Sequence, residues 1–326
     1  MTFHPSVRGS SPSDRDTIGV LVMAYGGPDS LDDIEPYLLD VRGGRATSSE
    51  MVEEMRERYR LIGGRSPILE CTLAQADRLQ QTLNGSTDGP VYRCIVGMRH
   101  WTPRIDTALS QMQRDGISQA VGLVMAPHYS RMSIGAYFKK VDEAGSQVEV
   151  APIERWHLLP ELLDTLATRV TTALKTFPGD MRDRVSIIFT AHSLPERILE
   201  WNDPYPDELH ATVERVVQQL RQAGVSNPHE FAYQSAANTP DPWLGPDAGD
   251  VIERMQSNGI PGALIVPIGF TSDHVEILYD IDVELAQRAK RLGFVLERIP
   301  TLNDDPATMF GIARLVRQTA AERGWL

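Results

Sequence analysis

Two segments of the sequence place proton-exchanging or metal-binding side chains directly after apolar, β-branched runs. His192 follows one such run in AHSLPERI, and Glu276 follows another in GFTSDHVEILYDIDVEL. An imidazole and a carboxylate can accept protons or bind a transition metal near neutral pH. Ser193 and Glu196 have the spacing of a capping box, which predicts a helix start beside His192. The partial positive charge of a helix N-terminus would then keep this imidazole neutral.

A row of carboxylates extends from the second segment. Glu276, Asp280 and Glu284 recur at every fourth position, which predicts one face of a helix. Such a row repels itself unless a cation or solvent relieves it, so it could relay a hydrated divalent metal or protons. Structural alternatives stay open for each residue. Asp280 and Glu284 could form a solvated face, Glu276 could cap a helix with Asp273, and His192 could be a core histidine.

A glycine turn and a group of arginines could serve a flat, acidic ligand. VMAYGGPDS ends an apolar run at Tyr25 and lacks G-x-G-x-x-G, so the dinucleotide fingerprint is not met. Gly26 and Gly27 would let a flat ligand approach the backbone closely, although this segment alone favours an ordinary strand-to-helix turn. Arginine can clamp carboxylates bidentately, and the candidates near paired glycines are Arg42, Arg45 and Arg58.

Alternating strand-like and helix-like segments must position these residues. The candidate strands are 18–25, 91–96, 119–127, 148–153, 185–191, 230–234, 263–270 and 294–299. Helical patterns between them predict an α/β fold with two Rossmann-like domains, each a four-stranded parallel sheet flanked by helices. We expect a disordered tail at 1–16, a first domain at 17–127 and a second at 128–304. Helix 305–326 is compatible with either domain.

Polar residues gather where the predicted strands end. Ligands of open α/β sheets bind beyond the carboxyl ends of the strands. The residues found there are Tyr25, Arg99, His100, His128, Tyr129, His192, Gln234, Asp273, His274 and Glu276. The sequence therefore predicts one shared rim that carries the chemistry.

Composition narrows the class of protein. The chain has 326 residues and a formal net charge of −12, which argues against a general nucleic-acid binder. No apolar run is long enough for a transmembrane helix, and the N-terminus lacks the apolar core of a secretory signal. Cys71 and Cys94 are too few for a four-cysteine iron–sulfur cluster within one chain. We expect a cytoplasmic monomer.

Five motifs in order resemble the ferrochelatase family from about residue 18 to the C-terminus: VMAYGGP, IGGRSPI, AHSLPERI, NTPDPWLGPD and GFTSDHVEILYDID. The resemblance implies two Rossmann-like domains that enclose a porphyrin cleft. It assigns the metal-facing histidine to His192 and its acidic partner to Glu276. The family's acidic ladder, a suggested metal or proton route, matches Asp280 and Glu284.

Tyr25 refines the resemblance. Many protoporphyrin-type members have N-L-G-T-P where this chain has AYGGP, whereas a tyrosine here resembles the coproporphyrin III ferrochelatase branch. In that branch the tyrosine lies on the porphyrin face opposite the histidine and can contact the iron. QSAANTPDPWLGPD also resembles this branch. By the same matching, contacts to the macrocycle or its propionates are assigned to Arg42, Arg45, Arg58, Ser66 and Tyr137.

The resemblance implies an enzyme of haem biosynthesis that inserts Fe²⁺, as substrate, into coproporphyrin III. It implies no permanently bound cofactor and no iron–sulfur cluster. The alternatives are a protoporphyrin IX ferrochelatase, a cobaltochelatase that could use His128, and a non-catalytic haem or metal carrier. An apolar lip could touch the porphyrin or a membrane surface, and its candidate residues are Leu38, Leu39, Leu61 and Ile62.

Overall fold

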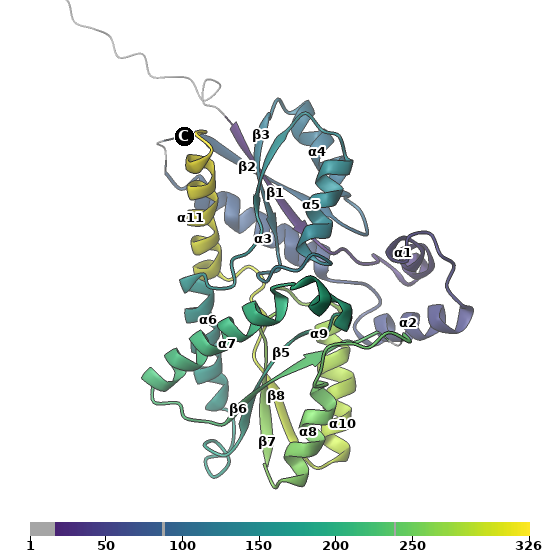
Figure 1. The fold of residues 1–326 in the computed structure, drawn as a ribbon, viewed down its shortest axis with the longest axis vertical. Coiled ribbons are helices and arrows are strands. Elements are labelled where there is room, and N and C mark those ends of the chain that lie inside the picture. The colour runs from purple at the N-terminus through teal and green to yellow at the C-terminus, as the bar shows by residue number, and fades with distance from the viewer. Residues whose placement is uncertain (1–16, 87–88, 238) are drawn as a thin grey trace, which may run out of the picture.

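The computed structural model describes residues 17–86, 89–237 and 239–326, and it contains two four-stranded parallel sheets (Figure 1). The first has the order β2-β1-β3-β4, formed by β1 (Thr17–Ala24), β2 (Val91–Met98), β3 (Gln119–Val124) and β4 (Glu149–Ile153). The second has the order β6-β5-β7-β8, formed by β5 (Ser186–His192), β6 (His229–Gln234), β7 (Gly262–Pro267) and β8 (Val295–Arg298). The predicted fold class is confirmed.

Helices flank both sheets. The helices of the first half are α1 (Ile34–Val41), α2 (Ser49–Leu61), α3 (Ile68–Leu83), α4 (Ile105–Arg114) and α5 (Ile134–Glu143). Those of the second half are α6 (Pro160–Leu174), α7 (Tyr205–Gln222), α8 (Ala248–Ser257), α9 (Val275–Leu278), α10 (Ala286–Arg291) and α11 (Pro306–Glu322). Short segments are η2 (Leu31–Asp33), η3 (Glu196–Trp201) and the π-helical η4 (Asp280–Leu285).

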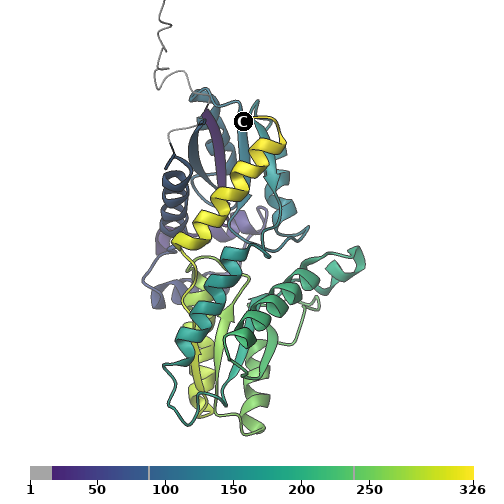
Figure 2. The ribbon, with the colours of Figure 1, turned by 90° about the vertical axis from the view of Figure 1, so that its left-hand side faces the viewer.

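The predicted boundary between residues 127 and 128 is wrong. Strand β4 pairs with β3, with Leu123 opposite Ile153, so the first domain continues past α5 and β4. The chain crosses to the second domain through α6 instead. Helix α11 packs against α3, β3 and β4, and therefore joins the first domain, as Figure 2 shows. The tail expected at 1–16 lies outside the described residues.

The two domains share a continuous apolar core. Strands β5 and β7 are buried along almost their whole length, which explains their uninterrupted apolar sequence. One buried cluster joins Val20 of β1 and Phe189 of β5 through Leu166 of α6 and Ile312 of α11. This shared core fixes the carboxyl ends of the two sheets relative to each other, and with them the rim predicted to carry the chemistry.

Helices α1 and α2 form a small unit beside the two sheets. A separate buried cluster of Ile34, Leu38, Val52 and Tyr59 holds them together, and Val275 of α9 packs against it. Of the four residues predicted to form an apolar lip, Leu39 and Leu61 are exposed, Ile62 is partly exposed, and Leu38 is buried. In the described parts of the chain no helix is both long and apolar enough to cross a membrane.

Candidate active site

A cleft of about 340 Å³ lies where the carboxyl ends of the two sheets meet. Residues from both domains line it, as expected for ligands of open α/β sheets. The first domain contributes Tyr25, Tyr37, Tyr59, Ser66, Arg99, His128 and Tyr137, among others, and the second contributes His192, Tyr205, Trp243, Phe270, His274 and Glu276. Tyr25 and the His192–Glu276 pair, predicted on separate grounds, therefore belong to one cavity.

The wall formed by the first domain is aromatic. Burial raises the pKa of Tyr25 to about 12, with the anionic Glu276 contributing, so its phenol stays protonated at neutral pH. Burial likewise raises the pKa of Tyr59 and Tyr137. The guanidinium of Arg99 lies 5.8 Å from the ring centre of Tyr25 and 5.4 Å from that of Tyr137. His100 supports Tyr25 from behind, with ring centres 4.7 Å apart.

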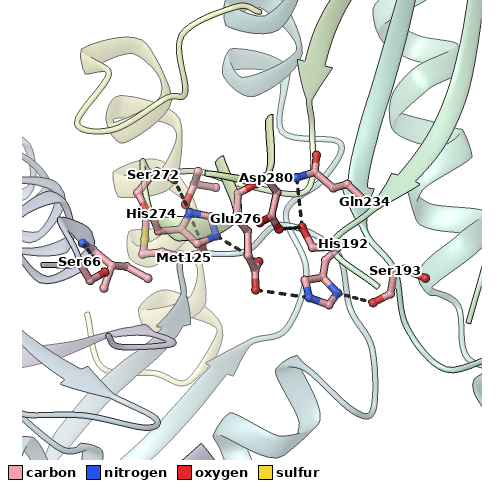
Figure 3. A network of polar contacts seen from close by, with 12 residues as sticks. Ser66, Met125, His192, Ser193, Gln234, Ser272, His274, Glu276 and Asp280 are labelled. Carbon is pink, nitrogen blue, oxygen red and sulfur yellow. Dashed lines mark hydrogen bonds and ion pairs between the residues drawn. The ribbon is translucent and has the colours of Figure 1, made fainter. Parts of the chain in front are cut away.

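The opposite wall is built around a carboxylate between two imidazoles (Figure 3). Nε2 of His192, the last residue of β5, lies 3.4 Å from Oε1 of Glu276. Nε2 of His274 lies 3.2 Å from Oε2 of the same carboxylate. The other ring nitrogens donate to backbone carbonyls, from His192 Nδ1 to Ser193 and from His274 Nδ1 to Ser272. Each ring therefore has an oxygen opposite both nitrogens, an arrangement that favours the imidazolium.

The electrostatics agree with this geometry. Burial disfavours the charged ring, but Glu276 outweighs burial and raises the pKa of His192 to about 9. The same carboxylate raises the pKa of His274. Burial opposes the ionised form of Glu276 as well, yet the two imidazoles hold its pKa well below the usual range. The prediction that His192 is neutral is therefore wrong, because the adjacent carboxylate dominates its surroundings.

Neither predicted capping box forms. Ser193 Oγ donates to the carbonyl of Leu244 at 2.8 Å, and the short helix η3 starts after Pro195. Asp273 accepts from Thr301 at 2.7 Å and from Asn303 at 3.0 Å, so it does not pair with Glu276. The carboxylate of Glu276 is thus left to the two histidines.

The carboxylate row leaves the cleft along α9 and η4. Eight residues make about 2.2 turns of an α-helix, so Glu276 and Glu284 would drift apart around its axis. In η4 the N–H of Glu284 bonds to the carbonyl of Tyr279 at 2.9 Å, a π turn that contains one more residue. This turn reduces the drift and keeps the row on one side. The helix expected there is present, with a π-helical segment in its middle.

Asp280 is the half-buried middle of this row. Burial raises its pKa to about 6, and Glu276 adds to the shift, while Ser235 and Arg58 oppose it. Ser235 Oγ donates to Asp280 Oδ2, and Arg58 Nη1 lies 3.6 Å from Oδ1. Glu284 is exposed at the outer end. The row therefore runs from an ionised carboxylate in the cleft, through the less exposed Asp280, to solvent.

The residues predicted to contact porphyrin divide into two groups. Tyr25, Ser66 and Tyr137 line the cleft. The arginines do not. Arg58 pairs with Glu54 and Asp280, Arg42 contacts Met51, and Arg45 donates to the carbonyl of Arg42 at 3.1 Å. Their assignment to the propionates stays a prediction.

His128 lines the same cleft as His192 but is more deeply buried and has no carboxylate partner among the described residues. It is 2% exposed, and its Nε2 lies 2.9 Å from the hydroxyl of Thr212. Burial, with a contribution from the stacked His157, holds its pKa well below the ordinary value. No group of three His, Cys, Asp or Glu side chains within the described ranges is arranged to hold a metal ion. His128 therefore does not complete a metal site with His192.

Comparison with known proteins decides the family. The family model described as Ferrochelatase matches residues 17–320. The chain belongs to the ferrochelatase family. A ferrochelatase from Herpetosiphon aurantiacus is 44% identical over 292 residues, which is 88% of this chain and 94% of the relative. One from Deinococcus radiodurans is 42% identical over 310 residues, 94% of this chain and 96% of the relative. The coproporphyrin III ferrochelatase of Bacillus subtilis is 37% identical over 306 residues, covering 93% and 97%.

Solved structures agree on the fold. The structure titled SirB from Bacillus subtilis with Fe3+ has a TM-score of 0.55 at 11% identity, covering 95% of this chain and 97% of that one. At so low an identity, the similarity is evidence for a shared fold and for nothing further. As a ferrochelatase, the protein is an enzyme of haem biosynthesis that inserts iron into a porphyrin.

Sequence reasoning left several lining residues of this ferrochelatase without a role. Arg99 and His274 were placed on the rim by the strand-end rule, but nothing local distinguished them from their neighbours. Trp243 lies in NTPDPWLGPD, and the motif alone could have suggested it. Tyr37 and Tyr59 lie in helices far from any predicted strand end, so only the packing of α1 and α2 reveals them.

Proposed function

We propose that this ferrochelatase inserts Fe²⁺ into coproporphyrin III, and that His192 and Glu276 accept and remove the pyrrole protons. The observation that supports this is the His192–Glu276–His274 group facing an aromatic wall across one cleft. A flat macrocycle between the walls would present one face to the imidazole and the other to Tyr25. The enzyme would act as a cytoplasmic monomer without a resident cofactor.

The reaction removes two pyrrole protons for each Fe²⁺ inserted. His192 must first lose its own proton, because an imidazolium cannot act as a base. Asp280, with a pKa near 6, is the next group along the row and the exposed Glu284 follows it. Protons would pass from His192 through Glu276 to this row and then to water. The neutral imidazole would then take a proton from the macrocycle, and a second cycle would remove the other.

The two walls would also bend the macrocycle. Iron can approach the pyrrole nitrogens only when they point out of the plane, and a closely fitting cleft can supply such strain from remote binding energy, of about 1–5 kcal/mol. Tyr25 would stay a neutral phenol until the metal arrives, since its pKa is about 12. It would then offer an oxygen ligand on the face away from His192.

The choice of coproporphyrin III has two supports. One is Tyr25 in the wall of the cleft. The other is that several relatives named coproporphyrin III ferrochelatase are 35–38% identical to this chain over more than nine tenths of its length. In this proposal Ser66 and Tyr137 contact the macrocycle inside the cleft. Arg42, Arg45 and Arg58 receive propionates that extend beyond it.

A spectroscopic assay tests the proposal. Purified enzyme is mixed anaerobically with Fe²⁺ and excess coproporphyrin III or protoporphyrin IX, and the visible spectrum is followed. We expect many turnovers with coproporphyrin III and a lower kcat/KM with protoporphyrin IX. The reverse preference would assign protoporphyrin IX as the substrate. Metallation that stops at one equivalent would indicate a carrier, and turnover with Co²⁺ and sirohydrochlorin alone would indicate a cobaltochelatase.

A further inference from the structure

The end of strand β6 lies directly beside His192. The register of the second sheet pairs His192 of β5 with Gln234 of β6, so Ser235 is the first residue beyond that pair. Gln234 is buried, and its Nε2 donates to the backbone carbonyl of Glu276 at 2.8 Å. The same nitrogen lies 3.4 Å from the hydroxyl of Ser235. Strand β6 therefore ends at two side chains that contact the carboxylate row, and Figure 3 shows Gln234 near Glu276 and Asp280.

Ser235 has an unfavourable backbone conformation. Its φ is +61°, in the left-handed region that favours glycine. Within the described ranges, the other non-glycine residues with positive φ are Asn202 and Asn303, and asparagine tolerates this region well. A glycine at position 235 would have no such cost. The chain instead carries a serine, whose hydroxyl donates to Oδ2 of Asp280.

The strained backbone of Ser235 and its hydrogen bond to Asp280 both serve to position the Asp280 side chain. The left-handed turn directs the hydroxyl of Ser235 at the half-buried carboxylate of Asp280, while Gln234 fixes the backbone of Glu276 one turn earlier. Strained residues persist where the surrounding structure determines them, and they concentrate at functional sites. Two consecutive residues thus hold two consecutive members of the row.

We propose that Ser235 is a positioning residue for iron insertion, which holds Asp280 in line with Glu276 so that protons can leave the cleft. The inference rests on the proposed role of the carboxylate row. Ser235 does not line the cleft among the described residues, so it acts through Asp280 and leaves porphyrin binding unchanged. Polar groups that orient an active residue in this way commonly contribute about 10-fold or more to activity.

Two substitutions separate positioning from stability. Ser235→Ala removes the hydroxyl and keeps the backbone strain, whereas Ser235→Gly removes both. We expect kcat for iron insertion to fall about 10-fold in both variants, with an unchanged KM for porphyrin. We also expect Ser235→Gly to melt at a higher temperature than Ser235→Ala. Wild-type kcat in Ser235→Gly, or activity that follows the melting temperature, would overturn the inference.

A double-mutant cycle shows whether the effect passes through Asp280. In an Asp280→Ala background, Ser235→Gly should lower kcat no further, because the hydroxyl has lost its partner. Independent, multiplicative losses would contradict the inference. Asn202→Gly is the matched control, since it relieves the same kind of backbone conformation at an exposed residue of the η3 C-terminus. It should retain wild-type kcat.

A crystal structure of the Ser235→Gly variant provides a test that needs no turnover. The inference requires Asp280 to leave its wild-type side-chain position once the hydroxyl is gone. An Asp280 that stays in place overturns the inference even if the wild-type enzyme inserts iron normally. Conversely, failure of the wild-type enzyme to metallate either porphyrin, with a displaced Asp280 in the variant, would refute the proposed function and leave the positioning by Ser235 intact.

Discussion

The two walls of the cleft differ in whether their side chains exchange protons near neutral pH. The first domain presents phenol rings whose pKa values burial raises, with Arg99 stacked between Tyr25 and Tyr137. The second presents His192, which shares Glu276 with a second imidazole. Phenols with such pKa values keep their protons at neutral pH, whereas linked imidazole and carboxylate groups exchange them. The first wall is therefore suited to shape and contact, and the second to proton transfer.

The contrast arises from what surrounds each wall. Behind Tyr25, His100 is held by Asp40 at 3.0 Å, and Arg104 bonds to the same carboxylate at 2.8 Å, so those charges are neutralised away from the cleft. Behind Glu276 a further carboxylate, Asp280, leads outward instead. The groups behind the first wall form ion pairs with one another, whereas the groups behind the second are carboxylates in a row that ends at the exposed Glu284.

Replacement of the imidazole should have the largest effect. In His192→Ala the second wall loses the group that faces the macrocycle, and a general base contributes about 10²–10⁴-fold to a rate. We expect iron insertion to fall by that factor while porphyrin still binds, measured by quenching of protein fluorescence. A variant that retains turnover would show that the proton-transfer wall has been assigned wrongly.

Removal of the shared carboxylate should have the next largest effect. In Glu276→Gln the two imidazoles lose their common anion, and burial then favours the neutral ring. We expect the pKa of His192 to fall from about 9 to below its ordinary value, measured by NMR titration of the metal-free protein. Iron insertion should fall about 10- to 100-fold. An unchanged pKa would mean that the carboxylate does not control the imidazole.

The same substitution has a consequence for stability. The raised pKa of His192 stabilises the fold fully below the unfolded value of about 6.5, and this contribution is lost as pH rises through about 9. The free energy of unfolding of the wild type should therefore decline over that range more steeply than that of Glu276→Gln. Urea unfolding at several pH values measures it, and parallel curves would contradict the coupling.

A substitution in the wall formed by the first domain should lower the rate of iron insertion less. Tyr25→Phe removes one hydroxyl and leaves the ring, its contact with His100 and the whole second wall in place. We expect iron insertion to fall by less than the roughly 10²-fold expected of a general base, with an unchanged pH dependence. A loss of activity as large as that of His192→Ala would contradict the assignment of proton transfer to the second wall alone.

Local sequence predicted the parts of the site that depend on local order. His192 and Glu276 follow apolar runs, and the rule that ligands bind at strand ends placed them on one rim. The fold class followed from the same alternation of strands and helices. These features needed only the periodicity of the chain.

Features that depend on distant partners could not be predicted in this way. The charge of His192 depends on its distance from Glu276, and the elements that carry them share a buried cluster that includes Ile188 of β5 and Ile277 of α9. The domain boundary was missed because the pairing of β4 with β3 is a tertiary contact. The π turn at η4 and the contact of Arg58 with Asp280 likewise involve geometry that no spacing in the sequence encodes.

The contact between Arg58 and Asp280 leads to the smallest predicted effect. It joins α2 of the first domain to the carboxylate row of the second, with 3.6 Å between Nη1 of Arg58 and Oδ1 of Asp280. Arg58→Gln removes a cation that lowers the pKa of Asp280, so this pKa should rise above its present value of about 6 and less of the carboxylate should be ionised at pH 7. A partly exposed ion pair is worth up to about 1 kcal/mol, which is about 0.7 pKa units and lowers the ionised fraction of Asp280 at pH 7 roughly 1.4-fold.

The control for that variant lies on the same helix. Arg60→Gln removes an equal charge from α2, but Arg60 pairs with Glu53 and Glu57 and has no described contact with the row. We expect kcat of Arg58→Gln at pH 7 to fall by up to about 1.4-fold and to recover at pH 8.5, where Asp280 is ionised again. Arg60→Gln should match the wild type at both values. Equal losses of kcat in the two variants would mean that α2 acts through its net charge. The contact between Arg58 and Asp280 would then not control the pKa of Asp280.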